Sequence, residues 1–181
     1  LWFFIRAVAA VPISLRHYRS EFARLLSDIA WGNGSLVVGG GTAGVALVLG
    51  VTVGAIVGIE GYNFLNLLGL GPATGIISSL VNTRELAPIA ASLAFATQGG
   101  CRFTAQLGSM RIAEEIDALE VMAVRSMPYL VTSRIIAGFV AIIPLYTIGL
   151  LTSYLAARTI TVSVYGQSAG TYDHYFGLFL P

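Results

Sequence analysis

The sequence predicts an all-helical integral membrane protein, and three features of the chain carry this prediction. Hydrophobic residues make up 56% of the 181 positions and charged residues only 10%, against about a quarter charged residues in a soluble domain. Uncharged apolar segments long enough to cross a bilayer recur along the chain. One long charged stretch, residues 109–134, interrupts them and holds four of the nine acidic residues. We therefore expect a single membrane domain over residues 1–181.

Residues 1–30 predict a helix that lies in the plane of the lipid headgroups. Basic residues alternate there with apolar residues at helical spacing, which is typical of interfacial helices. The basic residues are Arg6, Arg16, Arg19 and Arg24, and the apolar set is Tyr18, Phe22, Leu25, Leu26 and Ile29. Trp2, Tyr18 and Trp31 fit an aromatic belt at the membrane surface. The alternative interpretation is an ordinary cytoplasmic helix packed on the spans.

The first membrane span is predicted at residues 36–59, inside a run from Ile29 to Ile59 that has no charge. Small residues recur at every fourth position of this span, and such ridges let helix backbones approach closely in lipid. They are Ala46, Gly50, Gly54 and Gly58. The pattern favours helix packing, and a substrate groove is the alternative.

A connector is expected from Glu60 to Gly71, because Gly69, Gly71 and Pro72 disfavour a continuous helix. Residues 60–72 contain no Arg, so this segment should face outside. The second span follows at 73–100 and carries Arg84 and Glu85 near its middle, with Pro88 just after. Charges at that depth face a protein interior or water. Two interpretations remain open: an ion pair, formed with other segments, that braces a kink at Pro88, or polar groups that line a transport path.

Residues 103–133 form a predicted cytoplasmic region, because Arg102, Arg111, Arg125 and Arg134 flank its acidic part. On one helix, an apolar face would run through Ile112, Ile116, Leu119 and Ala123, with Glu114 and Asp117 opposite. Arg111 and Glu115 would pair at i, i+4. This pattern is typical of a docking element for a partner protein, and the alternative is a solvated loop helix that caps two spans.

The third span is the uncharged run 135–157, between Arg134 and Arg158, and Pro144 should kink it. The remaining segment, 159–181, is expected outside. With a cytoplasmic N-terminus, eight of the ten Arg then lie in the two inner segments, 1–30 and 102–134.

A series of ordered motifs runs through the second half of the chain. They are Arg84-Glu85-Leu86-Ala87-Pro88, Gly99-Gly100-Cys101-Arg102, Ala105-Gln106-Leu107-Gly108-Ser109-Met110-Arg111, Glu114-Glu115-Ile116-Asp117-Ala118-Leu119-Glu120-Val121-Met122-Ala123-Val124, and Tyr129-Leu130-Val131 with Arg134. This series resembles the MlaE/YrbE permease family, the membrane subunits of MCE-type ABC transporters. The resemblance is to the YrbE "B" type that accompanies Mce proteins in mycobacteria and related actinobacteria.

The resemblance implies a permease that moves lipids such as fatty acids or sterols across the plasma membrane, usually as import. It implies a second permease chain, a cytoplasmic ATPase dimer that holds ATP and magnesium, and MCE proteins on the outer side. It also implies two further spans in full-length relatives, five in all, so we expect this chain to be incomplete at its C-terminus. The residues expected to couple to the ATPase are Glu114, Glu115, Ile116, Asp117, Leu119, Glu120 and Met122.

The sequence lacks the motifs of several other function classes. No Gly-x-x-x-x-Gly-Lys-Ser/Thr phosphate loop is present, so ATP hydrolysis is expected on a partner. No His/Cys cluster has metal-ligand spacing, the net charge of +1 does not favour nucleic acid, and Asp173-His174 is better explained by surface hydrogen bonds than by acid–base catalysis. Two alternatives to an ATP-driven permease remain: an ATP-independent lipid channel or flippase, and a membrane scaffold for MCE proteins.

Overall fold

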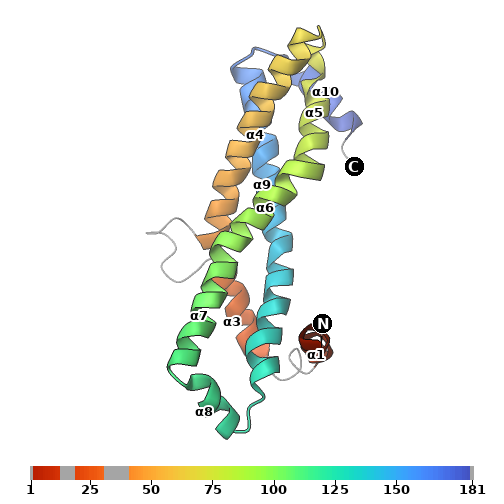
Figure 1. The fold of residues 1–181 in the computed structure, drawn as a ribbon. Helices are drawn as coiled ribbons and strands as arrows, with labels where there is room; N and C mark the ends of the chain where they lie inside the picture. The colour runs from red at the N-terminus through yellow and green to blue at the C-terminus, as the bar shows by residue number, and fades with distance from the viewer. Residues whose placement is uncertain (1, 13–18, 31–40, 180–181) are drawn as a thin grey trace. The chain divides into compact units, whose positions relative to one another are not determined.

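The computed structural model describes residues 2–12, 19–30 and 41–179, and every regular element within them is a helix (Figure 1). The predicted all-helical fold class is therefore confirmed for these residues. In chain order the elements are α1 (Trp2–Ala9), α3 (Arg19–Ala30), α4 (Gly41–Leu67), η1 (Gly71–Ala73), α5 (Thr74–Val81), η2 (Asn82–Leu86), α6 (Ala87–Ala94), η3 (Phe95–Gly100), α7 (Cys101–Ile112), α8 (Glu115–Val121), η4 (Met127–Thr132), α9 (Ser133–Ser163) and α10 (Ala169–Leu178).

Two helical segments in the described part of the chain are long and apolar enough to cross a membrane. They are Gly41–Leu67 and Met127–Ser163, each with a mean hydropathy of 2.2 in its most apolar window. The predicted second span, 73–100, is helical throughout, but its α-helical turns give way to wider π-helical turns in two places, η2 and η3. The number of spans stays a prediction, and residues 36–40 of the first span lie outside the described residues.

The chain divides into two compact units. Unit 1 comprises Leu1–Thr42 and Phe95–Ile143, and unit 2 comprises Ala43–Ala94 and Pro144–Pro181. The chain therefore passes between the units at three places, one within each predicted span. Unit 1 contains the two segments predicted to be inside the cell, 1–30 and 103–133, and unit 2 contains the two predicted to be outside, 60–72 and 159–181.

Within unit 1, the N-terminal helices pack on the region between the second and third spans. The hydroxyl of Thr132 donates a hydrogen bond to the Ala7 carbonyl of α1 at 3.1 Å, and Arg102 donates to the Asp28 carbonyl of α3 at 2.7 Å. Leu25 and Ile29 of α3 are buried, whereas Arg24 is exposed. The amphipathic pattern predicted for α3 thus has a buried apolar side. Arg16, His17, Tyr18 and Trp31 lie outside the described residues.

Within unit 2, α4 and α9 approach closely along the small residues of α4. A Cβ atom added at Gly54 would collide with the backbone of Ser153, and one added at Gly50 would collide with Thr152 and Gly149. At Gly58 the same atom would lie 3.0 Å from the Ala157 carbonyl oxygen. Ala46, the first residue of the ridge, is buried. These glycines therefore set the distance between two helix backbones.

The helix bounds add detail to three predicted segments, whose positions in the membrane stay predictions. Helix α4 continues through Glu60 to Leu67, so the predicted connector 60–71 is mostly helix. The backbone turns only around Gly69, whose φ of 72° is the conformation that glycine adopts most easily. Helix α9 extends to Ser163, past the predicted end of its span, and Pro144 lies inside it. Part of the predicted outer segment 159–181 is α10, which packs on α5 and η1.

Candidate functional site

The acidic segment of unit 1 is broken into two helices rather than one. Helix α7 ends at Ile112, and α8 begins at Glu115 after a turn in which Glu114 has a left-handed backbone (φ 55°). The predicted apolar face through Ile112, Ile116, Leu119 and Ala123 is therefore wrong, because it assumed one continuous helix. The sequence concealed this break, since a non-glycine residue rarely adopts a positive φ.

Helix α8 ends in a tight hydrogen-bonded turn. The Val124 amide donates to the Leu119 carbonyl at 3.0 Å and the Ala123 amide donates to the Glu120 carbonyl at 3.0 Å. With Ala123 at a φ of 60°, this is the Schellman pattern that commonly terminates helices. Residues 115–121 are thus a short helix with a defined turn at each end.

Two of the four acidic side chains in this segment are occupied within the chain. Arg111 pairs with Asp117 at 2.8 Å, not with Glu115 as the helical spacing predicted, because the turn at Glu114 redirects α8. The Ser126 hydroxyl donates to Glu120 at 2.6 Å. Glu114 and Glu115 are exposed, and no ion pair joins either to another described residue. They are the acids most available to a basic partner.

The exposed apolar side chains of this region also differ from the predicted set. Ile112, Val121 and Met122 are 87%, 88% and 65% exposed. Ile116 and Leu119 are only half-buried, and Ile116 lines a cavity of about 430 Å³ within unit 1. Of the predicted apolar contacts, Met122 is thus free to meet a partner, whereas Ile116 and Leu119 lie partly against the chain itself. Ile112 and Val121 complete an exposed apolar set beside the acids.

A cavity of about 610 Å³ lies beside the end of α8. Residues of α1 and of the segment that leads from α8 into η4 line it together, among them Arg6, Glu120 and Arg125. The guanidinium of Arg6 also lies 4.0 Å from the ring centroid of Trp2. The N-terminal helix therefore borders the same surface as the acidic segment.

The second candidate site lies in unit 2, on the π-helical turn η2. Arg84 and Glu85 of this turn and Pro88 of α6 are all exposed. Among the described residues neither Arg84 nor Glu85 forms an ion pair. The expectation that each meets a partner group or water stays a prediction. Single π-helical turns inside α-helices are frequent at functional sites.

Tyrosines of α9 hold the backbone of η2. Tyr146 donates a hydrogen bond to the carbonyl of Thr83 at 3.1 Å, and the hydroxyls of Thr83 and Tyr154 are in contact. The Thr83 hydroxyl also reaches the Ser79 carbonyl one turn earlier. The residue directly before Arg84 is thus tied to another helix through both its backbone and its side chain.

A buried polar chain continues from η2 toward α10. The Asn82 amide donates to Ser78 at 3.4 Å, and the Tyr172 hydroxyl donates to the same Ser78 at 2.7 Å. Burial raises the pKa of the Tyr172 phenol above its usual range, although the hydrogen bond with Ser78 opposes the shift. The tyrosine is therefore a neutral donor, which fixes α10 to the helix that carries η2.

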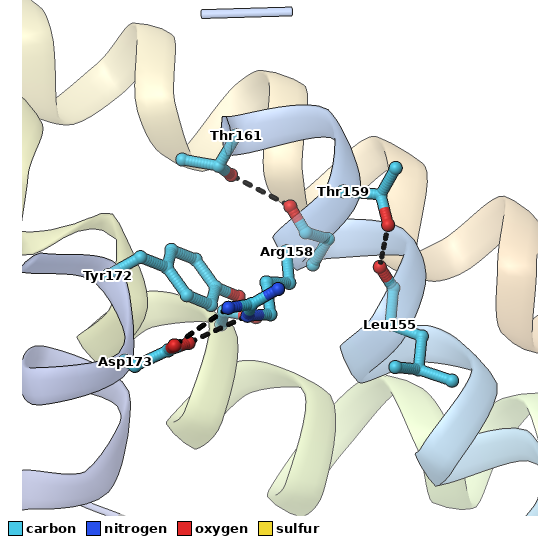
Figure 2. A network of polar contacts seen from close by, with 8 residues as sticks. Leu155, Arg158, Thr159, Thr161, Tyr172 and Asp173 are labelled. Carbon is cyan, nitrogen blue, oxygen red and sulfur yellow. Dashed lines mark hydrogen bonds and ion pairs between the residues drawn. The ribbon is translucent and has the colours of Figure 1, made fainter. Parts of the chain in front are cut away.

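An ion pair secures α10 at its exposed side (Figure 2). Nε and Nη2 of Arg158 donate hydrogen bonds to the two carboxylate oxygens of Asp173, each at 2.7 Å. The hydrogen bond and charge of Arg158 hold the pKa of the Asp173 carboxyl below its usual value. Asp173 is therefore occupied by Arg158, and the neighbouring His174 ring lies against Tyr175, 5.5 Å between centroids.

Comparison with known proteins identifies the family of the chain. Residues 33–181 match the family described as Permease MlaE, which covers most of the chain, including η2, α8 and α10. The chain belongs to the MlaE permease family.

Individual relatives of this MlaE-family chain come from bacteria and a plant chloroplast. The chloroplastic protein trigalactosyldiacylglycerol 1 of Arabidopsis thaliana is 33% identical over 69% of the chain, and that alignment covers 36% of the relative. The intermembrane phospholipid transport system permease MlaE of Haemophilus influenzae is 31% identical over 54%, covering 37% of the relative. A probable ABC transporter permease of Synechocystis is 34% identical over 56%, covering 38%. The chain thus spans well under half the length of these relatives.

Some residues of this MlaE-family site carry no strong sequence signal. Tyr146 and Tyr154 stand in an apolar run and read as ordinary membrane aromatics. Asn82 and Thr83, beside Arg84, are a weak signal, because two further polar residues in an apolar helix suggest a polar neighbour. The predicted small-residue ridge and the predicted polar pair lie in unit 2, and the acidic segment lies in unit 1.

Proposed function

We propose that this chain is a permease subunit of an ATP-driven, MCE-type lipid transporter that imports hydrophobic substrates such as fatty acids or sterols. The observation that carries the proposal is the match of residues 33–181 to the MlaE permease family. The name of the Haemophilus relative, a phospholipid transport permease, supports lipid as the substrate class. The resemblance of the motif series to the YrbE "B" type supports an MCE-type system.

The proposed complex contains a second YrbE-type permease chain, a cytoplasmic ATPase dimer and MCE proteins on the outer side. ATP and magnesium bind to the ATPase subunits, and the chain itself supplies the membrane path. The complex lies in the plasma membrane. Three spans belong to this chain, at 36–59, 73–100 and 135–157, and the N-terminal segment 1–30 is an interfacial elbow helix on the cytoplasmic side.

Contacts within the two units support this topology. Tyr62 and Tyr165 stack with ring centroids 4.1 Å apart, and Gln167 donates to the Pro72 carbonyl at 2.7 Å. Both contacts join the two segments proposed to lie outside, 60–72 and 159–181. The contact from Thr132 to Ala7 joins the two proposed to lie inside. Two segments that contact each other must lie on the same side of a membrane, and each pair of contacting segments is on one side in the proposed topology.

Helix α8 is the proposed coupling element. It follows α7, which continues the second span, and it precedes η4, which leads into the third. A force applied to α8 by the closing ATPase dimer therefore reaches two spans through short, hydrogen-bonded turns. Transport follows if the two resulting states bind lipid differently. Glu114 and Glu115 are the proposed contacts to a basic rim, with Ile112, Val121 and Met122 as the apolar contacts.

Arg84 and Glu85 are proposed to border the lipid path. Their exposure on this chain leaves them free to face the second permease chain or water between the two subunits. An uncompensated charge facing hydrocarbon costs several kcal/mol, so an exposed pair in a span indicates a polar surrounding in the assembled protein.

Copurification with the ATPase tests the coupling proposal. Glu114→Lys combined with Glu115→Lys should release the ATPase while the permease stays in the membrane. Glu60→Lys, which changes another exposed acid at the proposed outer end of α4, is the control and should retain the ATPase. Undiminished copurification of the double variant would refute the docking role of α8.

A further inference from the structure

A groove in unit 1 opens between the second and third spans. It has a volume of about 530 Å³, within the roughly 300–1,000 Å³ of small-molecule sites. Its walls are almost wholly apolar: Phe95, Phe103 and Leu107 from η3 and α7, and Val131, Ile135, Phe139 and Ile142 from η4 and α9. A chain of methylene groups is a ligand that such an apolar surface suits.

One lining residue does not fit an apolar ligand. Arg134 borders the groove and is only 8% exposed. One terminal nitrogen donates to the Leu130 carbonyl at 2.9 Å, but the Nε atom is buried without a hydrogen-bond partner in the described part of the chain. A buried charge is costly unless an opposite charge and hydrogen bonds compensate it.

The rest of unit 1, as far as it is described, does not supply that opposite charge. Glu21 of α3 acts electrostatically on Arg134 without forming an ion pair with it, and the Glu21 carboxylate pairs with Arg24 at 3.1 Å. No carboxylate forms an ion pair with Arg134 among these residues. The residue also lies in Met127–Ser163, a segment apolar enough to cross a membrane. Arg134 directly precedes the proposed third span, 135–157, and in that topology its guanidinium lies near the headgroups of the cytoplasmic leaflet.

We propose that this groove binds one acyl chain of an anionic amphiphile from the bilayer, with the negatively charged headgroup held at Arg134. Charge complementarity selects this occupant over a neutral lipid or an apolar helix from a second copy, because neither provides an anion for the guanidinium. A carboxylate headgroup and a phosphate headgroup both accept charge-assisted hydrogen bonds from a guanidinium. The inference rests on the proposed function only in placing the groove within a membrane.

Quenching of a tryptophan reporter by brominated stearate tests the site on the purified full chain in detergent, without ATPase or ATP. The reporter is Phe139→Trp, at the groove, and the control reporter is Val140→Trp, which is exposed but does not line it. Both are made with Trp2 and Trp31 replaced by Phe. The probes are dibrominated stearate under alkaline conditions and its methyl ester, which has the same chain without the charge.

We expect half-maximal quenching at Phe139→Trp with about tenfold less anionic probe than ester, and no such preference at Val140→Trp. Arg134→Gln should abolish the preference and Arg134→Lys should retain part of it. If Arg134→Gln does not fold, the proposal is tested by comparing the acid and the ester on the reporter variant that keeps Arg134. The proposal would be overturned if both probes quenched Phe139→Trp at equal concentrations, or if Val140→Trp showed the same preference for the anionic probe. It would also be overturned if a second copy of the chain covered the groove and neither probe quenched the reporter. A failure of ATP-driven transport alone would leave this result untouched.

Discussion

The phenol oxygen of Tyr146 lies 3.1 Å from the backbone carbonyl oxygen of Thr83 and donates a hydrogen bond to it. Thr83 precedes Arg84 in the π-helical turn η2, where the regular α-helical hydrogen bonding is interrupted. A side chain from α9 thus takes up a carbonyl in the turn that presents Arg84 and Glu85. This contact makes the orientation of the polar pair depend on α9.

Removing the phenol hydroxyls should therefore loosen the polar pair without unfolding the protein. We expect Tyr146→Phe combined with Tyr154→Phe to lower lipid transport per assembled complex several-fold, because each lost hydrogen bond is worth about 0.5–1.5 kcal/mol. Transport in proteoliposomes, normalised to assembled complex, measures this. Tyr62→Phe, which keeps the stack with Tyr165, is the control. Unchanged transport in the double variant would remove the positioning role.

Alanine at the polar pair separates a lipid path from a structural brace. Arg84→Ala and Glu85→Ala should reduce transport more than they reduce ATPase binding, because the two residues lie in unit 2 and the coupling helix lies in unit 1. If both variants lower expression and assembly together, with transport per complex unchanged, the pair is only structural.

A methyl group at Gly54 should separate α4 from α9. The added Cβ of Gly54→Ala would collide with the Ser153 carbonyl group, and relief of such overpacking typically costs about 1–3 kcal/mol. Gly108→Ala is the matched control, since nothing lies within 4 Å of its added Cβ. Thermal unfolding in detergent should show a lower midpoint for Gly54→Ala alone, and equal midpoints would contradict the close approach.

Acid should weaken the attachment of α10. Arg158 lowers the pKa of the folded Asp173 carboxyl below its ordinary value of 3.8, so the ion pair contributes stability at neutral pH. That contribution falls as the pH drops below the ordinary pKa of the carboxyl. It is lost below the lowered pKa of the folded state, because the protonated Asp173 no longer forms the ion pair. Limited proteolysis of α10 with an acid protease should rise over this range, and Asp173→Asn should remove the dependence.

The proposed topology predicts which loops reagents reach from outside. Cysteines placed at Asn66 and Ser168, in a background with Cys101 replaced by Ser, should react with an impermeant thiol reagent added to intact cells. The physical reason is the distribution of Arg, eight of which lie in 1–30 and 102–134. Labelling of either site only after the membrane is opened would reverse the orientation.

Composition and periodicity predicted the helical class, because membrane burial leaves a strong apolar signal over long segments. The glycine ridge was equally visible, since its four-residue spacing is itself the geometry of one helix face. The break at Glu114 was not visible, because an acidic residue with a positive φ is set by tertiary context. Because of that break, Arg111 pairs with Asp117 and not with Glu115, the partner that the helical spacing predicted. The contact between Tyr146 and Thr83 joins residues 63 positions apart, beyond any local pattern.

In the proposed mechanism, an ATPase drives lipid movement through this chain by way of α8. The most direct measurement is transfer of a fluorescent lipid across proteoliposomes that contain the permease chains and the ATPase, with and without ATP. We expect transfer only with ATP, its loss when the ATPase is catalytically inactive, and its loss with Glu114→Lys and Glu115→Lys together. Lipid transfer that proceeds equally without ATP would contradict the claim and identify a passive lipid channel instead.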